Sequence, residues 1–170
     1  MKNNKDHDTL TFNALKRAGY NFAVTLPCGM LKGLIRKVED CPDIIHVPLA
    51  REEEGVGIAA GAHLGGKKPV MIVQSSGVAN ALNSITSLSI AYQIPLLIIM
   101  SYRGSLHEFA PAQVPLGLAL EGILRSLGVP FVILDDPDKA ETLISGADSL
   151  AKAAGRPVAV LLTRQPKGTP

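Results

Sequence analysis

The chain has 170 residues, of which 46% are hydrophobic and 19% are charged, and its formal net charge is +2. This length suits one domain with a full core, and a near-neutral charge without a basic stripe argues against nucleic-acid binding. Cys28 and Cys41 have no metal-ligand spacing, and the apolar run 94–100 is too short to span a bilayer. We therefore expect a cytoplasmic protein with reduced thiols, no metal site of its own and no membrane contact.

Short apolar runs alternate along the chain with segments of helical length. The runs are rich in β-branched residues and indicate strands buried on both faces, which is typical of a parallel sheet covered by helices. The predicted strands are Phe22–Leu26, Ile44–Leu49, Val70–Gln74, Pro95–Met100, Phe131–Leu134 and Val158–Thr163. The predicted helices are Asp8–Ala18, Met30–Glu39, Glu52–Leu64, Val78–Tyr92, Gly117–Leu127 and Pro137–Ala154.

Helix stop and start signals fall between these segments. Gly19, Gly128 and Gly155 each follow a helix, and Asp136 with Pro137 supplies a cap and a first-turn proline. The sequence therefore predicts one α/β domain over residues 1–170. We expect an open six-stranded parallel sheet with helices on both faces, and flexible ends at 1–7 and 166–170.

Three consecutive carboxylates, Glu52, Glu53 and Glu54, lead into a helix of small residues at 55–61. Small side chains allow another backbone or a flat ligand to approach closely, so an acid at this point can serve a site. Acids in a first helical turn also complement the positive end of the helix dipole, so a solvated structural role is the alternative.

Unusual loops follow three predicted strands, at 26–29, 51–55 and 75–80. Because the carboxyl ends of parallel strands meet at one edge of the sheet, these loops can converge on one ligand. The segment 101–115 follows another strand and has no clear period, yet it contains Arg103, His107, Glu108 and Gln113. It is either a functional loop or a solvated connection.

Several common catalytic motifs are missing from the sequence. Neither a Gly-x-Gly-x-x-Gly nor a Gly-x-x-x-x-Gly-Lys-Ser/Thr phosphate loop is present, and Gly65–Lys68 indicates a turn. The run 75–77 is not a nucleophile elbow, since Gln74 and Val78 occupy the positions that need glycine. We interpret His46 as a core histidine and His63 as a residue at a packing edge.

Five short motifs together resemble the pyrimidine-binding (PYR) domain of thiamine diphosphate-dependent 2-oxoacid decarboxylases. Within that family the chain is most similar to the enzymes that act on sulfopyruvate and phosphonopyruvate, over roughly residues 18–163. The motifs are Leu-Pro-Cys-Gly (26–29), the acidic turn followed by Ala-Ala-Gly (59–61), Ser-Gly-Val-Ala-Asn (76–80), Ile-Pro-Leu (94–96) and Tyr-Arg-Gly (102–104).

The resemblance implies one catalytic glutamate, whose family role is to hydrogen-bond N1′ of the cofactor's aminopyrimidine and start a proton relay. Counting without gaps from Gly61 and Pro69 selects Glu52, and alignment to a nearby glycine selects Glu53 as the rival. The implied cofactor-binding residues are Pro27, Cys28, Gly29, Glu52, Ser76, Gly77 and Asn80.

The resemblance leaves the substrate side less defined. Many relatives have a histidine where this chain has Gln113, and His107 lies earlier in the same segment. Arg103 suits a sulfonate or phosphonate anion, or else pairs with a neighbouring subunit. The substrate-side candidates are therefore Arg103, His107 and Gln113.

The family's diphosphate and Mg²⁺ motif, Gly-Asp-Gly followed by Asn, is not found in this sequence. The resemblance thus implies a beta subunit that holds both groups, in a hetero-oligomer built on dimers. The implied reaction of a small anionic 2-oxoacid is sulfopyruvate to sulfoacetaldehyde and CO2, on a route such as coenzyme M biosynthesis. Phosphonopyruvate as substrate, and a non-catalytic regulatory partner, stay open as alternatives.

Overall fold

All six strands pair in parallel, in the order β2-β1-β3-β4-β6-β5. The computed structural model describes residues 7–164. The strands are β1 (Phe22–Thr25), β2 (Ile45–Pro48), β3 (Pro69–Gln74), β4 (Leu96–Ser101), β5 (Phe131–Leu134) and β6 (Pro157–Leu162). The predicted open six-stranded sheet is confirmed. The flexible ends predicted at 1–7 and 166–170 lie outside the described residues, except His7, which is the first residue of α1.

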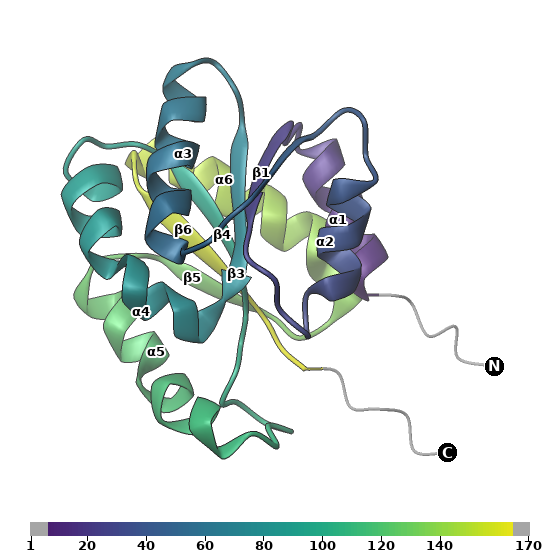
Figure 1. Ribbon diagram of the computed structural model, residues 1–170, viewed down its shortest axis with the longest axis vertical. Helices are drawn as coiled ribbons and strands as arrows, with labels where there is room; N and C mark the ends of the chain where they lie inside the picture. The colour runs from purple at the N-terminus through teal and green to yellow at the C-terminus, as the bar shows by residue number, and fades with distance from the viewer. Residues whose placement is uncertain (1–6, 165–170) are drawn as a thin grey trace.

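Helices cover both faces of the sheet (Figure 1). One face carries α1 (His7–Arg17), α2 (Lys32–Glu39) and α6 (Ala140–Ala154), and the other carries α3 (Glu52–Leu64), α4 (Ser75–Ser84) and α5 (Val114–Ser126). Neighbouring strand residues alternate between the two cores, so Ile99 packs with the first layer and Ile98 with the second. None of the helices in the described part of the chain is long and apolar enough to cross a membrane.

The two edge strands depart from the prediction that every strand is buried on both faces. Ile45 in β2 is 47% exposed and Ile133 in β5 is 39% exposed, whereas every residue of β4 is buried. The reason is topological, because β2 and β5 each have only one neighbouring strand. An apolar run alone does not distinguish a central strand from an edge strand.

The helix that follows β3 starts earlier than predicted. The sequence places its start at Val78, but α4 begins at Ser75 directly after the last residue of β3. Its second part, Ile85–Ile90, is a π-helix. Thr86 and Ser87 there donate side-chain hydrogen bonds to the carbonyls of Leu82 and Asn83 at 3.0 and 2.7 Å, a type of bond that often bends helices.

The irregular segment predicted at 101–115 is shorter in the structure. Ser101 completes β4, Pro111–Gln113 forms a 3₁₀ turn, and α5 begins at Val114 rather than at Gly117. Proline suits the first turn of a helix, so Pro111 and Pro115 continue this structure instead of interrupting it.

The predicted glycine stop at Gly155 is confirmed, whereas the predicted Asp136 cap belongs to a 3₁₀ turn and not to α6 itself. Gly155 ends α6 in the left-handed conformation with φ of +58°, and Asp136 accepts a hydrogen bond from the backbone N–H of Asp138 at 3.0 Å. The segment Pro137–Lys139 is a 3₁₀ turn, so α6 itself begins at Ala140.

Candidate active site

The predicted site residues lie at the carboxyl edge of four adjacent strands. β2, β1, β3 and β4 are neighbours in the sheet, and each is followed by one of the loops that the sequence marks as unusual. In an open α/β sheet this edge is where ligands bind. The loops therefore converge on one region, as expected.

Glu52 is buried at the start of α3 and faces the first turns of α4. Its residue is 7% exposed, and its Oε2 accepts a hydrogen bond from Asn80 Nδ2 at 3.3 Å. The other oxygen, Oε1, lies against Gly77, where any side chain would collide with the carboxylate. Three residues that the sequence assigns to the cofactor, Glu52, Gly77 and Asn80, are thus brought together.

The other two acids of the turn are placed differently. Glu53 forms an ion pair with Arg51, with 2.6 Å between Oε1 and Nε, and its buried Oε2 has no hydrogen-bond partner among residues 7–164. Glu54 is exposed. Within residues 7–164, Glu52 contacts two other predicted site residues, Gly77 and Asn80.

Gln74, the last residue of β3, joins the remaining cofactor-side candidates. The buried Cys28 thiol donates to Gln74 Oε1 at 3.7 Å, and it also lies 3.4 Å from Ser101 Oγ. Gln74 Nε2 donates to Ser76 Oγ and, at 3.1 Å, to Gln113 Oε1. Gln74 was missed in the sequence, although a polar residue at the end of an apolar strand was a usable signal.

Pro27 and Gly29 lie outside this network. Both residues are exposed, and they line a separate hollow of about 480 Å³ against α2, together with Lys32 and Arg36. Cys28 also lines this hollow, and its thiol contacts Gln74 of β3 and Ser101 of β4, so Cys28 links the hollow to the network.

Arg103 and Glu108 form a buried bidentate ion pair beside Gln74. Arg103 Nε and Nη2 donate to Glu108 Oε2 and Oε1 at 2.6 and 3.0 Å, and Arg103 Nη1 donates to Gln74 Oε1 at 3.2 Å. These donors of Arg103 are engaged within the chain, and its pairing with a neighbouring subunit stays a prediction. The hydrogen bond to Glu108 raises the pKa of Arg103.

Glu108 is the centre of the loop between β4 and α5. Its side chain is only 4% exposed, and it accepts backbone hydrogen bonds from Gly104, Phe109 and Ala110, each at 3.0 Å. The Arg103 guanidinium, helped by the backbone N–H groups of Gly104 and Ala110, holds the pKa of Glu108 well below its usual range. The sequence showed Glu108 as one polar residue among several and gave no sign of this role.

The substrate-side candidates separate into two groups. Gln113 and Arg103 both contact Gln74. His107 is exposed, has φ of +65° and lines a different hollow of about 530 Å³ beside Ile133 of β5. His107 is thus not brought together with Gln113.

His46 and His63 both lie apart from the Glu52 and Gln74 contacts. His46 lies on the edge strand β2, is partly buried, and forms a 2.7 Å hydrogen bond with Thr25 Oγ1. His63 lies near the end of α3 and lines a hollow at the opposite edge of the sheet. No group of three His, Cys, Asp or Glu side chains in the described residues could hold a metal ion.

The chain is similar to known proteins over most of its length. The model of the thiamine pyrophosphate enzyme N-terminal TPP binding domain matches residues 6–108. Sulfopyruvate decarboxylase subunit alpha of Methanothermobacter thermautotrophicus is 41% identical over 157 residues, which are 92% of this chain and 95% of that protein. The chain belongs to the family of sulfopyruvate decarboxylase alpha subunits.

Two further relatives of the chain are longer proteins. Sulfopyruvate decarboxylase of Methanosarcina acetivorans is 43% identical over 130 residues, covering 76% of this chain and 33% of that protein. Phosphonopyruvate decarboxylase of Streptomyces viridochromogenes is 36% identical over 86 residues, covering 51% of this chain and 22% of that protein.

A solved structure has the same fold. A 2-oxoglutarate:ferredoxin oxidoreductase from Magnetococcus marinus matches with a TM-score of 0.70 at 18% identity, covering 92% of this chain and 28% of that chain. At this identity the likeness concerns the fold alone.

The contact between Glu52 and Gly77 gives a stability prediction. Gly77→Ala adds a methyl group where the Glu52 carboxylate lies, so we expect a loss of about 1–3 kcal/mol in the free energy of unfolding, measured with urea. Gly146→Ala is the control, because it lies in α6 with open space around it and should stabilise by up to about 1 kcal/mol. A Gly77→Ala variant as stable as Gly146→Ala would contradict the contact.

The Glu108 ion pair gives a pH prediction. A lowered folded-state pKa means that the carboxylate stabilises the fold fully above the ordinary glutamate pKa of about 4.3, and less as the pH falls from there toward the lowered value. Glu108→Gln should cost about 3 kcal/mol of unfolding free energy at pH 7, and its difference from the wild type should narrow below about pH 4.

Asp43→Asn is the matched control for this pH prediction. It breaks an exposed ion pair with Lys16, in which Lys16 Nζ lies 2.6 Å from Asp43 Oδ2 and the Asp43 side chain is 75% exposed. Solvent screens exposed pairs, so its effect at pH 7 should be the smaller one. Equal losses in both variants, or a Glu108→Gln difference that does not change between pH 7 and pH 3, would contradict the assignment.

Proposed function

We propose that the chain is the alpha subunit of a thiamine diphosphate-dependent decarboxylase that converts sulfopyruvate to sulfoacetaldehyde and CO2. The observation that carries this proposal is the buried Glu52 carboxylate, which faces Gly77 and Asn80 at the carboxyl edge of the sheet. The names of the relatives support the choice of substrate. The cytoplasmic location stays a prediction.

The residues around Glu52 fit the aminopyrimidine end of the cofactor. Gly77 has no side chain, so the Glu52 carboxylate lies directly against helical backbone, and a flat ring can approach this surface closely. The Asn80 amide holds one oxygen of Glu52. When bound, thiamine diphosphate supplies an electron sink for the electron pair that is released as CO2 leaves.

In this proposal Glu52 holds and moves a proton at its carboxylate. Asn80 fixes the orientation of that carboxylate through Oε2, and the packing of α3 against α4 limits the access of water. A positioned acid or base of this kind contributes about 10²–10⁴-fold to rate. Glu53, engaged by Arg51, is the less suitable candidate.

The substrate's anionic group is proposed to meet Gln113 and the remaining N–H groups of Arg103, whose side chain is 12% exposed. Both residues contact Gln74, so they form one polar surface next to Ser76. Because Glu108 neutralises most of the Arg103 charge, we expect recognition by directed hydrogen bonds rather than by an isolated positive charge. Sulfonate and phosphonate groups both accept such bonds.

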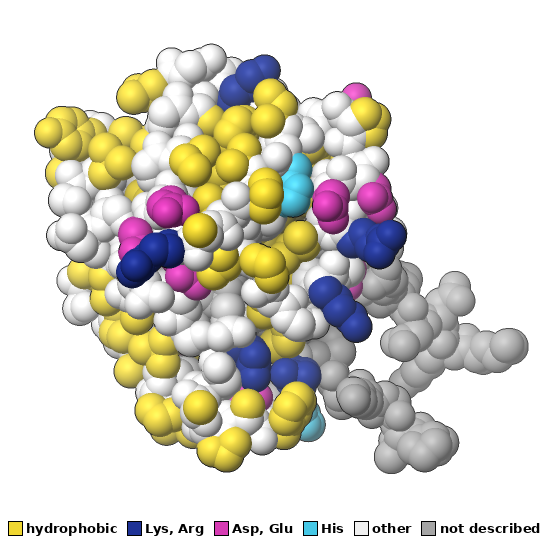
Figure 2. Space-filling view, in the orientation of Figure 1, with side chains coloured by type: hydrophobic (Ala, Val, Ile, Leu, Met, Phe, Trp, Pro, Cys, Tyr) yellow, Lys and Arg dark blue, Asp and Glu magenta, His cyan; other side chains and the backbone are white. Residues whose placement is uncertain are grey.

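The beta subunit is proposed to hold the diphosphate and Mg²⁺ and to cover the face made by α3, α4 and α5. Figure 2 shows many hydrophobic side chains over this face. Ile58 and Leu64 of α3 are 37% and 76% exposed, and Leu118 of α5 is 78% exposed. A relative that is about three times the matched length, and the name "subunit alpha" of others, support a second chain.

The test uses the chain co-purified with its beta subunit, thiamine diphosphate and Mg²⁺. CO2 release is measured with sulfopyruvate, phosphonopyruvate and pyruvate, and sulfopyruvate should react fastest. Phosphonopyruvate reacting fastest would move the proposal to that substrate. No CO2 from any of the three, with no cofactor bound, would favour a non-catalytic regulatory subunit and overturn the proposal.

The role of Glu52 is tested in the same assembly. Glu52→Gln should lower decarboxylation by about 100-fold or more, and it should slow exchange of the cofactor's thiazolium C2 proton with deuterated solvent, followed by NMR. Assembly with the beta subunit should be unchanged, because the substitution keeps the shape of the side chain. Glu53→Gln is the matched control and should lose little, and the reverse pattern would assign the role to Glu53.

A further inference from the structure

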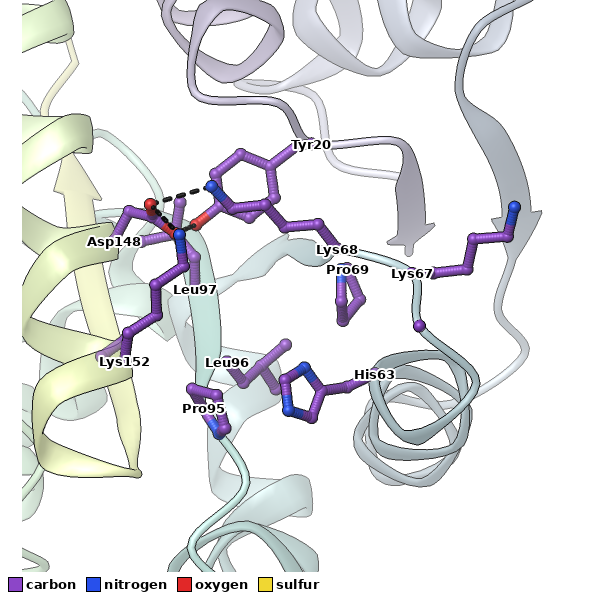
Figure 3. Close-up of a pocket in the computed structure, with 12 residues that line it drawn as sticks. Tyr20, His63, Lys67, Lys68, Pro69, Pro95, Leu96, Leu97, Asp148 and Lys152 are labelled. Atoms are coloured by element: carbon purple, nitrogen blue, oxygen red, sulfur yellow. Dashed lines mark hydrogen bonds and ion pairs between the residues drawn. The ribbon is translucent and has the colours of Figure 1, made fainter.

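The hollow lined by His63 lies at the amino edge of the sheet, on the opposite side from Glu52. It has a volume of about 310 Å³ and opens where α3 and α6 approach the starts of β3 and β4. Figure 3 shows Lys68, Asp148 and Lys152 together on one side of this hollow and His63 on the other. Its floor is apolar and consists of Pro69, Pro95, Leu96 and Leu97.

The charges beside the hollow do not balance. Lys68 Nζ and Lys152 Nζ both contact the same oxygen, Asp148 Oδ2, at 2.8 and 2.9 Å. Tyr20 donates its hydroxyl to the other oxygen, Oδ1, at 2.9 Å, and burial together with Asp148 raises the pKa of Tyr20, which keeps the phenol neutral. Two ammonium groups therefore share one carboxylate, and the cluster retains one positive charge.

The two lysines differ in what they can still donate. Lys68 is partly buried, donates also to the Ala18 carbonyl, and lies 4.5 Å from the centre of the Tyr20 ring. Within residues 7–164, Lys152 Nζ donates only to Asp148, so its other N–H groups remain for a ligand. Burial lowers the pKa of Lys68, as expected for a cation that is incompletely compensated.

The backbone at this edge offers few donors of its own. Pro69 and Pro95 have no N–H group, and the Lys68 backbone N–H already donates to Asn21 Oδ1 at 2.8 Å. Lys67 points away from the hollow (Figure 3). A ligand there would meet an apolar floor, the ammonium groups at one end and the His63 ring at the other.

We propose that this hollow binds a small organic anion, with its charged head at Lys152 and Lys68 and a short apolar body over Pro95 and Leu96. One lysine paired with Asp148 would be enough to hold α6 against the sheet. The second lysine and the open apolar floor beside it go beyond that need. None of these residues takes part in the proposed decarboxylation, since they lie at the other edge of the sheet.

The test is an NMR titration of the ¹⁵N-labelled full chain with butylphosphonate, and separately with inorganic phosphate and with butanol. Butylphosphonate should give saturable shifts of the Leu96 and Leu97 amides, weaker at high salt because the attraction is ionic. Phosphate, which lacks the body, and butanol, which lacks the charge, should each bind more weakly. The readout needs neither cofactor nor turnover, so its failure leaves the proposed function unaffected.

Two lysine variants make the test specific. Lys152→Met keeps the apolar stem and removes the charge, so it should weaken butylphosphonate binding by about tenfold. Lys139→Met, at an exposed lysine on the turn before α6, should bind like the wild type. The proposal is overturned if the amides show no saturable shift, if Lys152→Met binds as well as Lys139→Met, or if phosphate or butanol binds as tightly as butylphosphonate.

Discussion

The arrangement of the candidate site depends on one steric condition, which is that a buried carboxylate lies where α4 has no side chain. The Glu52 carboxylate fills the space that a side chain at position 77 would occupy. Since β3 passes into α4 without an intervening residue, the sheet itself sets the position of Gly77. The first turn of α4 is therefore positioned by the central strand β3, whereas residues 49–51 connect the edge strand β2 to Glu52 at the start of α3.

The second half of the site is organised by charge. Arg103 donates to Glu108 through Nε and to Gln74 through Nη1. Gln74 in turn contacts Cys28, Ser76 and Gln113. A glutamine can donate and accept at once, so Gln74 can link residues that follow three different strands. A substitution at Gln74 would thus reach both the cofactor side and the substrate side.

The sequence predicted the fold and part of the site, for different reasons. Buried aliphatic runs and glycine caps depend on local chemistry, so the six strands and their parallel arrangement were predictable. The edge position of β2 and β5 was not, because strand order is decided by packing between distant segments. Glu52, Gly77 and Asn80 were found through a family resemblance. The roles of Gln74 and Glu108 were not predictable, because both depend on contact with Arg103, which is 29 residues from Gln74 and 5 residues from Glu108 along the chain.

The loop between β4 and α5 has an unusual internal dependence. Three backbone N–H groups donate hydrogen bonds to the two carboxylate oxygens of Glu108, namely those of Gly104, Phe109 and Ala110. These three hydrogen bonds do not break independently, because movement of the Glu108 carboxylate breaks all of them at once. In hydrogen exchange the three amides would therefore open as a single unit, even though five residues separate the first from the last along the chain.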